Sequence, residues 1–378
     1  MHCGQACLVV LIGVLQQLPF AAIGPLLPFE MAKRGFSQLF IGAVLSVYGV
    51  TWLCVPELTV KWLFPRCGRT KTAQIATLIT GLAMLSLSIA GAVSTFSLFS
   101  TFAFIGRFLQ GLGAALEQTS YTAVLAHKFE AQRAFYMQIY TLSLTVGLLS
   151  GPLMAGYLKP IIGYSLVFLI IGVLAFLKVF AYCAYPEKRR ALHAPSHQHF
   201  PQQLGLRATC KICGKLPPLF ALIAAYLISA IYTNYESVLA TSLAANYDSS
   251  TLWIGLYFSV FVVASVAVSF PLAFLTSPDK RPFILASLLL SSVFAYIVGP
   301  SQMFQLPHRS TLTLIGVVGS GLSYGLGFNY LLPEAYRACE KTFSVADPVL
   351  LIDKVSSLIP TIWGLQKLLL PLYISAFD

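Results

Sequence analysis

Repeated apolar runs of about twenty residues constrain this chain more than any other feature. A helix of that length crosses the hydrocarbon core of a bilayer. Only 10% of the 378 residues are charged, whereas a soluble domain carries about 25%. Eleven runs lie near 6–29, 38–60, 72–94, 97–126, 133–158, 162–184, 218–243, 252–276, 282–300, 311–333 and 355–377. At membrane depth, backbone groups must form their hydrogen bonds within one helix or within a closed β-barrel. Because the runs have the length of spanning helices, the sequence predicts an all-α polytopic transmembrane bundle.

Basic residues between the runs predict the orientation of the chain. With a cytoplasmic N-terminus, seventeen Lys and Arg residues fall in cytoplasmic loops and four fall in loops on the other side. Cytoplasmic loops of membrane proteins are enriched in these residues, so we expect a multi-pass protein with its N-terminus in the cytoplasm. The net charge of +11 has the same origin and does not indicate a nucleic-acid partner. The pattern does not distinguish a vesicle or lysosome membrane from the plasma membrane.

A polar, basic stretch at 185–217 separates six runs from five. Secondary transporters are commonly built from two halves with the solute site between them. We therefore predict an N-terminal six-helix half at 1–184, a cytoplasmic linker at 185–217 and a C-terminal half of about five helices at 218–378. An even arrangement needs one more span, so we expect the twelfth to be missing, either from the gene product or through reduction of the second half. A lone CxxC pair in the linker favours solvated residues over a zinc site.

Polar residues follow one face of the fourth run. Arg107, Gln110, Glu117 and Tyr121 recur at helical spacing, with Ala114 between them. Exposing such a stripe to lipid is costly, so we expect it to face a solute and proton pathway. The alternative is that Arg107 and Glu117 belong to hydrogen-bond networks between helices and touch no solute.

Later runs carry further polar candidates. Glu236 and Asn234 lie in the seventh run beside tyrosines, and a carboxylate with aromatic faces suits an amine. A proton-relay or structural role for Glu236 stays open. Asn329 in the tenth run either contacts solute or bonds a neighbouring helix.

The remaining charges near or within the runs are expected to have structural roles. Glu57, near the end of the second run, has Lys61 four residues later and is expected to pair with it. Lys178 and Lys367 lie within runs and are expected to snorkel or pair.

Several motifs resemble a known family. The run GRFLQGLGAA at 106–115 resembles the fourth-helix motif of major facilitator superfamily transporters, and GLLSGPLMAG at 147–156 resembles the fifth-helix motif of its antiporters. Stretches at 27–38, 234–239 and 325–333 are similar to the vesicular amine transporter group, above all its polyamine-transporter-like branch. The resemblance covers nearly the whole chain and is weaker after residue 190. It implies two helical halves that expose a central cavity alternately to each side.

The resemblance also implies mechanical roles for small residues and for one loop. Close packing and flexing of the fourth and fifth helices are expected of Gly111, Gly113, Gly147, Gly151, Pro152 and Gly156. The gating loop after the second run keeps Arg66, Gly68 and Arg69 but lacks the family's aspartate, which leaves its gating role open. No acid precedes Glu30 in the first helix, and this argues against a monoamine carrier.

Together these observations predict a secondary active transporter that works by alternating access. The expected reaction is proton-coupled antiport of a small organic cation, an amine or polyamine, in which protonation of Glu117 or Glu236 competes with cation binding. We expect a monomer in the lipid bilayer whose ligands are a small solute and protons. We expect no cofactor, no metal, no nucleic acid and no enzymatic activity. The alternative is a non-transporting, receptor-like or degenerate relative of the same fold, favoured by the missing span and the altered loop.

Overall fold

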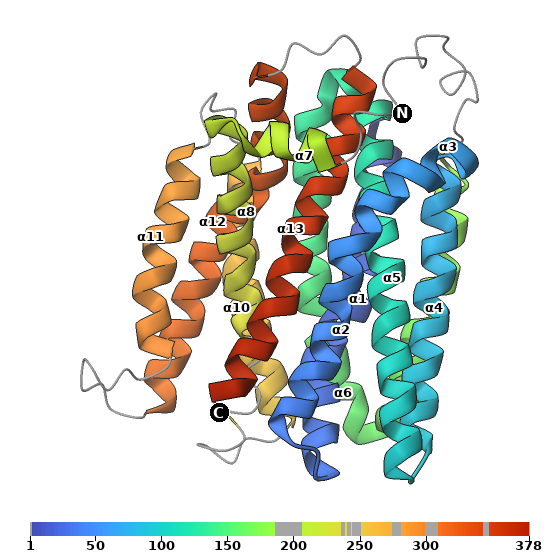
Figure 1. The fold of residues 1–378 in the computed structure, drawn as a ribbon. Helices are drawn as coiled ribbons and strands as arrows, with labels where there is room; N and C mark the ends of the chain where they lie inside the picture. Colours follow the sequence, from blue (N-terminus) through green and yellow to red (C-terminus); the bar gives the residue numbers. More distant parts are fainter. Residues whose placement is uncertain are drawn as a thin grey trace.

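A computed structural model gives the fold of the chain (Figure 1). It describes residues 2–185, 206–235, 239, 243, 251–273, 281–298, 309–342 and 348–377. The regular elements within these ranges are all helical. They are α1 His2–Lys33, α2 Gln38–Leu58, α3 Phe64–Cys67, α4 Arg69–Ala92, α5 Phe96–Lys128, α6 Arg133–Tyr182, α7 Leu206–Cys213, α8 Leu216–Asn234, α10 Thr251–Ala273, α11 Arg281–Val298, α12 Ser310–Thr342 and α13 Pro348–Phe377, with a π-helix η1 at Thr59–Leu63 and a 3-10 turn η2 at Glu130–Gln132.

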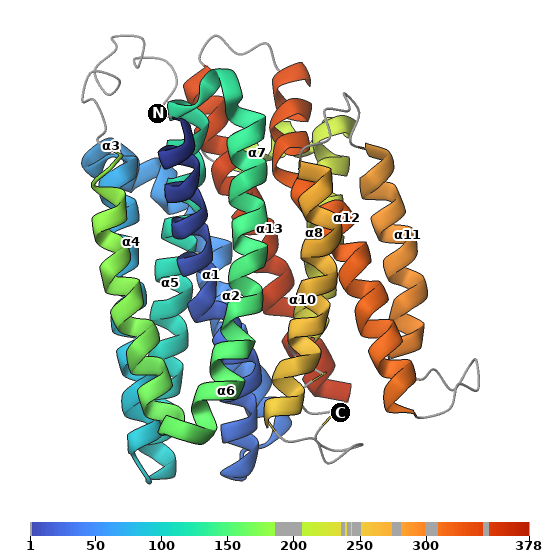
Figure 2. The same cartoon turned by 180° about the vertical axis from the view of Figure 1, so that it is seen from behind.

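Length and apolarity make this bundle a membrane-spanning one. Nine helices of the described ranges are long and apolar enough to cross a bilayer. With 50 residues, α6 would be about 75 Å long as one rod, well beyond a hydrocarbon core of about 30 Å. Gly163 breaks it with φ 82° and ψ 168°, a conformation that glycine adopts without a Cβ clash. The chain therefore turns there and returns along the bundle (Figure 2).

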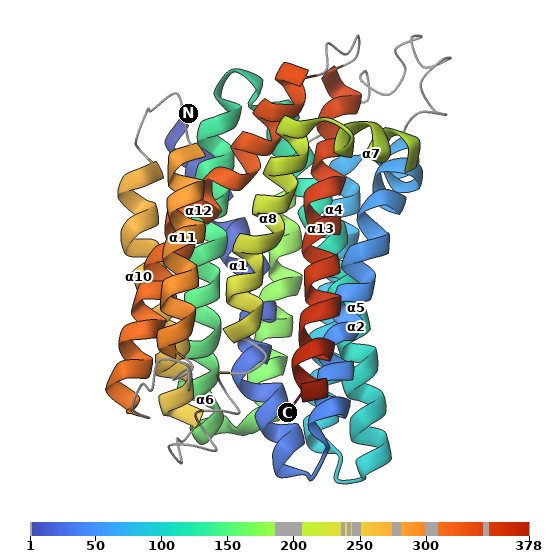
Figure 3. The ribbon, with the colours of Figure 1, turned by 60° about the vertical axis from the view of Figure 1, so that its left-hand side comes forward.

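The helices form two sets, which we call the N-terminal set (α1–α6) and the C-terminal set (α8–α13). The sets lie side by side, and α13 runs next to α2 in two views (Figures 1 and 3). The N-terminus, the end of α6 and α7 lie at one end of the bundle, here named the linker end. The C-terminus lies at the opposite end.

Glycines bring the two sets into backbone contact. A Cβ added at Gly364 of α13 would lie 2.7 Å from the carbonyl oxygen of Trp52 on α2. One added at Gly49 of α2 would lie 2.6 Å from the carbonyl carbon of Lys367. Gly255 of α10 likewise packs closely against Pro152 of α6. Small residues at these points let helix backbones approach, as is common where membrane helices associate by packing.

Two element boundaries and one additional helix differ from the sequence prediction. Helix α12 continues through Pro333 to Thr342 instead of ending near 333, and α13 begins at Pro348 instead of near 355. The predicted linker contains the short helix α7. Hydropathy detects only the apolar part of a helix, whereas these helical ends carry the charged residues Glu334, Arg337, Glu340, Asp353 and Lys354.

Candidate functional site

A small cavity lies where the two helix sets meet. Its volume is about 40 Å³, which is room for roughly one water molecule and far below the few hundred Å³ of an ordinary ligand pocket. The N-terminal set lines it with Gln17, Phe20, Trp52, Gln118, Leu144 and Leu148. The C-terminal set lines it with Ser229, Tyr232, Thr233, Tyr324, Phe328, Trp363 and Lys367. The helices therefore leave too little space here for an organic solute.

Aromatic rings from both sets form its walls. Phe20 lies 6.1 Å from Tyr232 between ring centroids, so α1 meets α8 through these rings. Trp52 lies 6.2 Å from Trp363, so α2 meets α13 in the same way. Phe328 of α12 stacks on Trp363 at 5.7 Å. Such rings offer an apolar surface with a negative face, which suits the hydrocarbon and the charge of an organic cation alike.

One cation lines this cavity from the C-terminal set. The ammonium nitrogen of Lys367 on α13 lies 3.9 Å from the ring centroid of Trp52, 4.4 Å from that of Phe20 and 4.8 Å from that of Tyr48. All three rings belong to α1 and α2. Lys367 therefore reaches across the boundary between the sets at the level of the cavity and does not simply snorkel to the membrane surface.

A buried amide and hydroxyl cluster adjoins the cavity on the N-terminal side. Gln16 Nε2 donates to Gln118 Oε1 at 2.8 Å, and Tyr140 OH lies 2.8 Å from each amide oxygen. Gln118 itself lines the cavity. Its Nε2 has no hydrogen-bond partner among the described residues, so it remains a donor for a solute or a water molecule.

The structure brings together only part of the predicted stripe on α5. The Arg107 guanidinium donates to Gln110 Oε1 at 2.7 Å and to the carbonyl oxygen of Leu45 at 3.2 Å, and it lies 4.8 Å from the centre of the Tyr48 ring. Arg107 and Gln110 thus face α2. The same Tyr48 ring lies 4.8 Å from the Lys367 ammonium, so both cations contact this ring.

Glu117 lies elsewhere, between α5 and the second limb of α6. Its carboxylate accepts a hydrogen bond from Tyr182 OH at 2.6 Å and forms an ion pair with Lys178 Nζ at 2.7 Å. The side chains of Glu117 and Lys178 are at most 1% exposed. Lys178 therefore pairs as predicted. Neither Glu117 nor Lys178 lines the central cavity.

Tyr121 belongs to an aromatic group near the linker end of α5. Its ring is surrounded edge-on by Tyr140, Tyr182 and Tyr185 at 5.2, 5.4 and 5.7 Å. Its hydroxyl donates to Tyr185 OH at 3.3 Å. Tyr121 is thus placed beside Glu117's partner Tyr182 and not in the cavity wall.

The structure describes the candidate residues of the C-terminal set to different extents. Asn234 ends α8 directly after the cavity residue Thr233, and the structure describes its backbone only. Glu236 lies outside the described residues. Asn329 is fully buried next to Phe328 and donates through Nδ2 to the carbonyl oxygen of Ser269 on α10 at 3.3 Å. Asn329 therefore makes the interhelical bond that was its alternative role.

The predicted glycines of α5 and α6 lie at close helix contacts. Cβ atoms added at Gly147 and Gly151 would lie 2.6 Å from the carbonyl oxygen of Val14 and 2.7 Å from the nitrogen of Ala22, both on α1. On α5, Gly111 packs on α2 and Gly113 on α4. Gly156 lies at the contact of α6 with Gly255 of α10, and Pro152 lies within α6 at the same contact. The residues of α6 set how closely this helix approaches α1 of its own set and α10 of the other, and those of α5 set its distance from α2 and α4.

At the linker end, the loop between α2 and α4 meets an acid from the other set. Arg69 donates to both carboxylate oxygens of Asp353 on α13, at 3.0 and 2.6 Å. His127 Nε2 of α5 lies 3.1 Å from Asp353 Oδ1. Asp353 of α13 thus joins the loop after α2 to the C-terminal set. In the same loop, Arg66 lies over the Trp62 ring and Gly68 takes a positive φ of 80° between α3 and α4.

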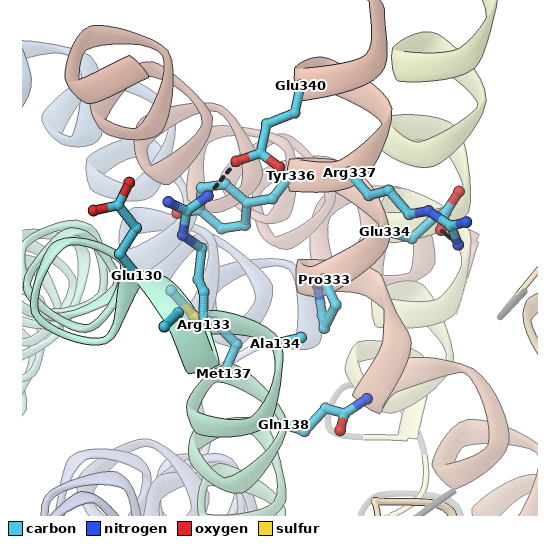
Figure 4. A pocket seen from close by; sticks show the side chains of 11 residues that line it. Glu130, Arg133, Ala134, Met137, Gln138, Pro333, Glu334, Tyr336, Arg337 and Glu340 are labelled. Atoms are coloured by element: carbon cyan, nitrogen blue, oxygen red, sulfur yellow. Dashed lines mark hydrogen bonds and ion pairs between the residues drawn. The ribbon is translucent and has the colours of Figure 1, made fainter. Parts of the chain in front are cut away.

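Two more ion pairs join the sets at this end. Glu57 of α2 pairs with Lys354 of α13 and accepts a hydrogen bond from Ser357 at 3.1 Å. The prediction that Glu57 pairs with Lys61 is wrong, because α13 begins early enough to bring Lys354 to it. Arg133 of α6 pairs with Glu340 of α12, above a vestibule of about 420 Å³ (Figure 4).

Sequence reasoning missed Gln118, Trp52, Trp363 and Asp353 as site residues. Tryptophans within apolar runs give no signal that separates a cavity wall from a lipid face. Lys367 did carry a signal, because a cation inside a span is costly and is by default a functional candidate.

Comparison with known proteins identifies a family and relatives to which this chain is similar. A model of the Major Facilitator Superfamily matches residues 9–340. The chain is 22% identical over 363 residues to the Rattus norvegicus protein named MFS-type transporter SLC18B1, covering 94% of this chain and 76% of that protein. The Homo sapiens protein of the same name is 22% identical over 360 residues, covering 93% and 75%.

Solved structures share the fold at low identity. The proton:xylose symporter XylE, bound to 6-bromo-6-deoxy-D-glucose, superposes with a TM-score of 0.74 at 12% identity, covering 99% of this chain and 88% of that one. The human organic anion transporter MFSD10 (TETRAN) superposes with a TM-score of 0.70 at 16% identity, covering 98% and 92%. These relatives are membrane transporters and not enzymes. Because the family model matches most of this chain, the chain belongs to the Major Facilitator Superfamily.

Proposed function

We propose that this multi-pass secondary transporter exchanges protons for a small organic cation, an amine or polyamine, carried between its two helix sets. The observation that carries the proposal is the ammonium of Lys367, seated 3.9 to 4.8 Å from three ring centroids at the central cavity. The three aromatic rings that contact the ammonium of Lys367 offer the same contacts that the ammonium of a solute needs. Such cation–π contacts are worth about 2 kcal/mol where water is excluded.

The proton-coupling acid of this proposal is Glu236. Of the two acids predicted from the sequence, Glu117 is engaged by Lys178 and Tyr182 away from the cavity lining. Glu236 follows the cavity residue Thr233 by three positions in the sequence. In the proposed exchange, a protonated carboxyl releases the solute cation, and the deprotonated carboxylate binds it again.

Alternating access is proposed to occur by relative motion of the halves 1–184 and 218–378 around the cavity. Three groups of ionic contacts between the sets lie at the linker end, centred on Asp353, Glu57 and Glu340. The excess of basic residues in the loops at this end supports a cytoplasmic position for it. In the proposed cycle the present arrangement is therefore closed to the cytoplasm, and the ion pairs separate when the cytoplasmic side opens.

Uptake into proteoliposomes tests this function. Purified protein is reconstituted and given radiolabelled spermidine with an acidic lumen, and then without a pH gradient. We expect saturable uptake that depends on the gradient, and we expect Glu236→Gln to abolish the gradient-dependent part. Absence of any protein-dependent uptake of spermidine, spermine or simpler amines would remove the proposed substrate class.

A matched control separates the two acids. Glu117→Gln is expected to reduce the amount of folded protein but to leave the gradient dependence of the remaining uptake unchanged. If Glu117→Gln removes the gradient dependence and Glu236→Gln does not, the proton site has been assigned to the wrong acid.

A further inference from the structure

Lys367 is a cation that the protein itself places in the cavity. It extends from α13 of the C-terminal set to the rings of Phe20, Tyr48 and Trp52 on the N-terminal set. The same residue lines the cavity together with Trp363. The α13 backbone is held close to α2 at Gly49, directly beside Lys367. The packing of α13 on α2 therefore holds the backbone of Lys367 beside these rings.

The contacts of this ammonium match those that a primary alkylammonium solute needs. All three ring centroids lie within about 6 Å, the range in which cation–π attraction is appreciable. The cavity left beside it measures about 40 Å³, too small for an organic solute. A solute ammonium therefore reaches these rings only if the Lys367 ammonium leaves them.

Lys178, a fully buried lysine within the described spans, is held in a different way. Lys178 pairs with Glu117 of its own helix set, away from the cavity. Lys367 contacts rings of the opposite set, so moving its ammonium also removes contacts between the sets.

We infer that Lys367 is a tethered competitor of the transported cation: its ammonium occupies the solute's ammonium site in the unloaded carrier, and the solute displaces it. This inference rests on the proposed function, since it concerns an amine site. Displacement removes the contacts of Lys367 with the rings of α1 and α2, which links solute binding to motion between the sets. The measured affinity for solute is accordingly reduced by the fraction of carriers in which Lys367 fills the site.

Equilibrium binding of radiolabelled spermidine to the purified full-length protein tests the inference. Lys367→Met keeps the length of the side chain and removes the charge. If Lys367 fills the site about nine-tenths of the time, the Kd falls by about tenfold. Lys367→Gln is expected to act in the same direction, and Lys367→Arg, which keeps a cation over the rings, is expected to remain near the wild-type Kd.

Lys128→Met is the matched control. Lys128 also lies over an aromatic ring, 4.0 Å from the centroid of Tyr185, but it is exposed at the linker end. Its removal is expected to leave the Kd unchanged. Monodispersity and thermal unfolding in detergent show whether each variant is folded. The two neutral variants, Lys367→Met and Lys367→Gln, give independent measurements of the Kd.

The outcomes separate this inference from the proposed function. If the wild type binds spermidine and both neutral variants bind it no more tightly, Lys367 is not a competitor, although the amine function stands. If neither the wild type nor a neutral variant binds any amine, the proposed substrate class fails and the inference with it. Tighter binding by Lys128→Met as well would mean that general loss of charge, and not release of the site, raises the affinity.

Discussion

Buried charges within the spans of this transporter meet partners on neighbouring helices. Arg107 donates to Gln110 and to the backbone of α2, and Glu117 is held by Lys178 and Tyr182. An unpaired charge at membrane depth is expensive. The contacts of Arg107 with Leu45 and of Glu117 with Lys178 and Tyr182 each join two helical segments. At the residue scale, Glu117 therefore stabilises the N-terminal set, whereas the cavity depends on aromatic and amide side chains.

Replacing Glu117 tests its structural role. Glu117→Gln leaves the Lys178 ammonium buried without its carboxylate, which we expect to cost about 3–5 kcal/mol. The thermal unfolding midpoint in detergent should fall, and adding Lys178→Met should restore most of it because both charges are then absent. An unfolding midpoint equal to that of the wild type in Glu117→Gln would contradict this role.

The sequence identified the polar face of α5 but not which neighbour each residue meets. Helical spacing aligns Arg107, Gln110, Glu117 and Tyr121 approximately, yet Arg107 faces α2 and Glu117 faces α6. The residue of this helix that lines the cavity is Gln118, one position further on. A polar residue buried against another helix and one facing a cavity are equally hidden from lipid, so hydropathy does not separate them.

At the element scale, the contact of α2 with α13 joins the two sets. Gly49 and Gly364 let these backbones touch, and Trp52, Trp363 and Lys367 fill the space on the cavity side. The helical ends beyond the apolar runs matter equally, because α12 and α13 carry Glu340, Asp353 and Lys354 into ion pairs. These polar ends of α12 and α13 resemble loops when helices are predicted from apolarity alone. The early start of α13 was therefore not predictable from the sequence.

A larger side chain at Gly364 should separate these two helices. In Gly364→Leu the new atoms would meet the backbone of Trp52, and overpacking of this kind costs about 1–3 kcal/mol. We expect a lower unfolding midpoint and a lower rate of solute uptake. Gly4→Leu is the control, because a Cβ at Gly4 meets no atom within 4 Å. Equal effects of both substitutions would mean that the α2–α13 contact has no special importance.

At the scale of the whole molecule, the ionic contacts between the sets gather at the linker end. The described ion pairs of the opposite end, Glu30 with Arg34 and Lys159, stay within the N-terminal set. This asymmetry is what a carrier closed at one end requires. The order of motifs predicted the family and its fold from sequence. The ionic contacts of the linker end were not predictable, because they join residues up to 300 positions apart.

Breaking the contact of Asp353 should open the linker end. Asp353→Asn removes the charge that Arg69 and His127 share, so thiol labelling of Cys339, buried at 3% exposure on α12, should become severalfold faster. Mass spectrometry of the peptide that contains Cys339 measures this rate. Glu30→Gln, at the opposite end, should leave the rate unchanged. An unchanged rate in Asp353→Asn would show that this ion pair does not hold the linker end closed.

The central claim, that the solute binds in the aromatic cavity between the sets, is tested most directly by tryptophan fluorescence. The chain has four tryptophans: Trp52 and Trp363 line the cavity, whereas Trp62 and Trp253 are 49% and 59% exposed. Trp62→Phe with Trp253→Phe leaves only the cavity pair as reporters, and Trp52→Phe with Trp363→Phe leaves only the outer pair. We predict a saturable fluorescence change on spermidine titration in the first variant and none in the second. A change confined to the outer pair, or none in either variant or in the wild type, would contradict the claim.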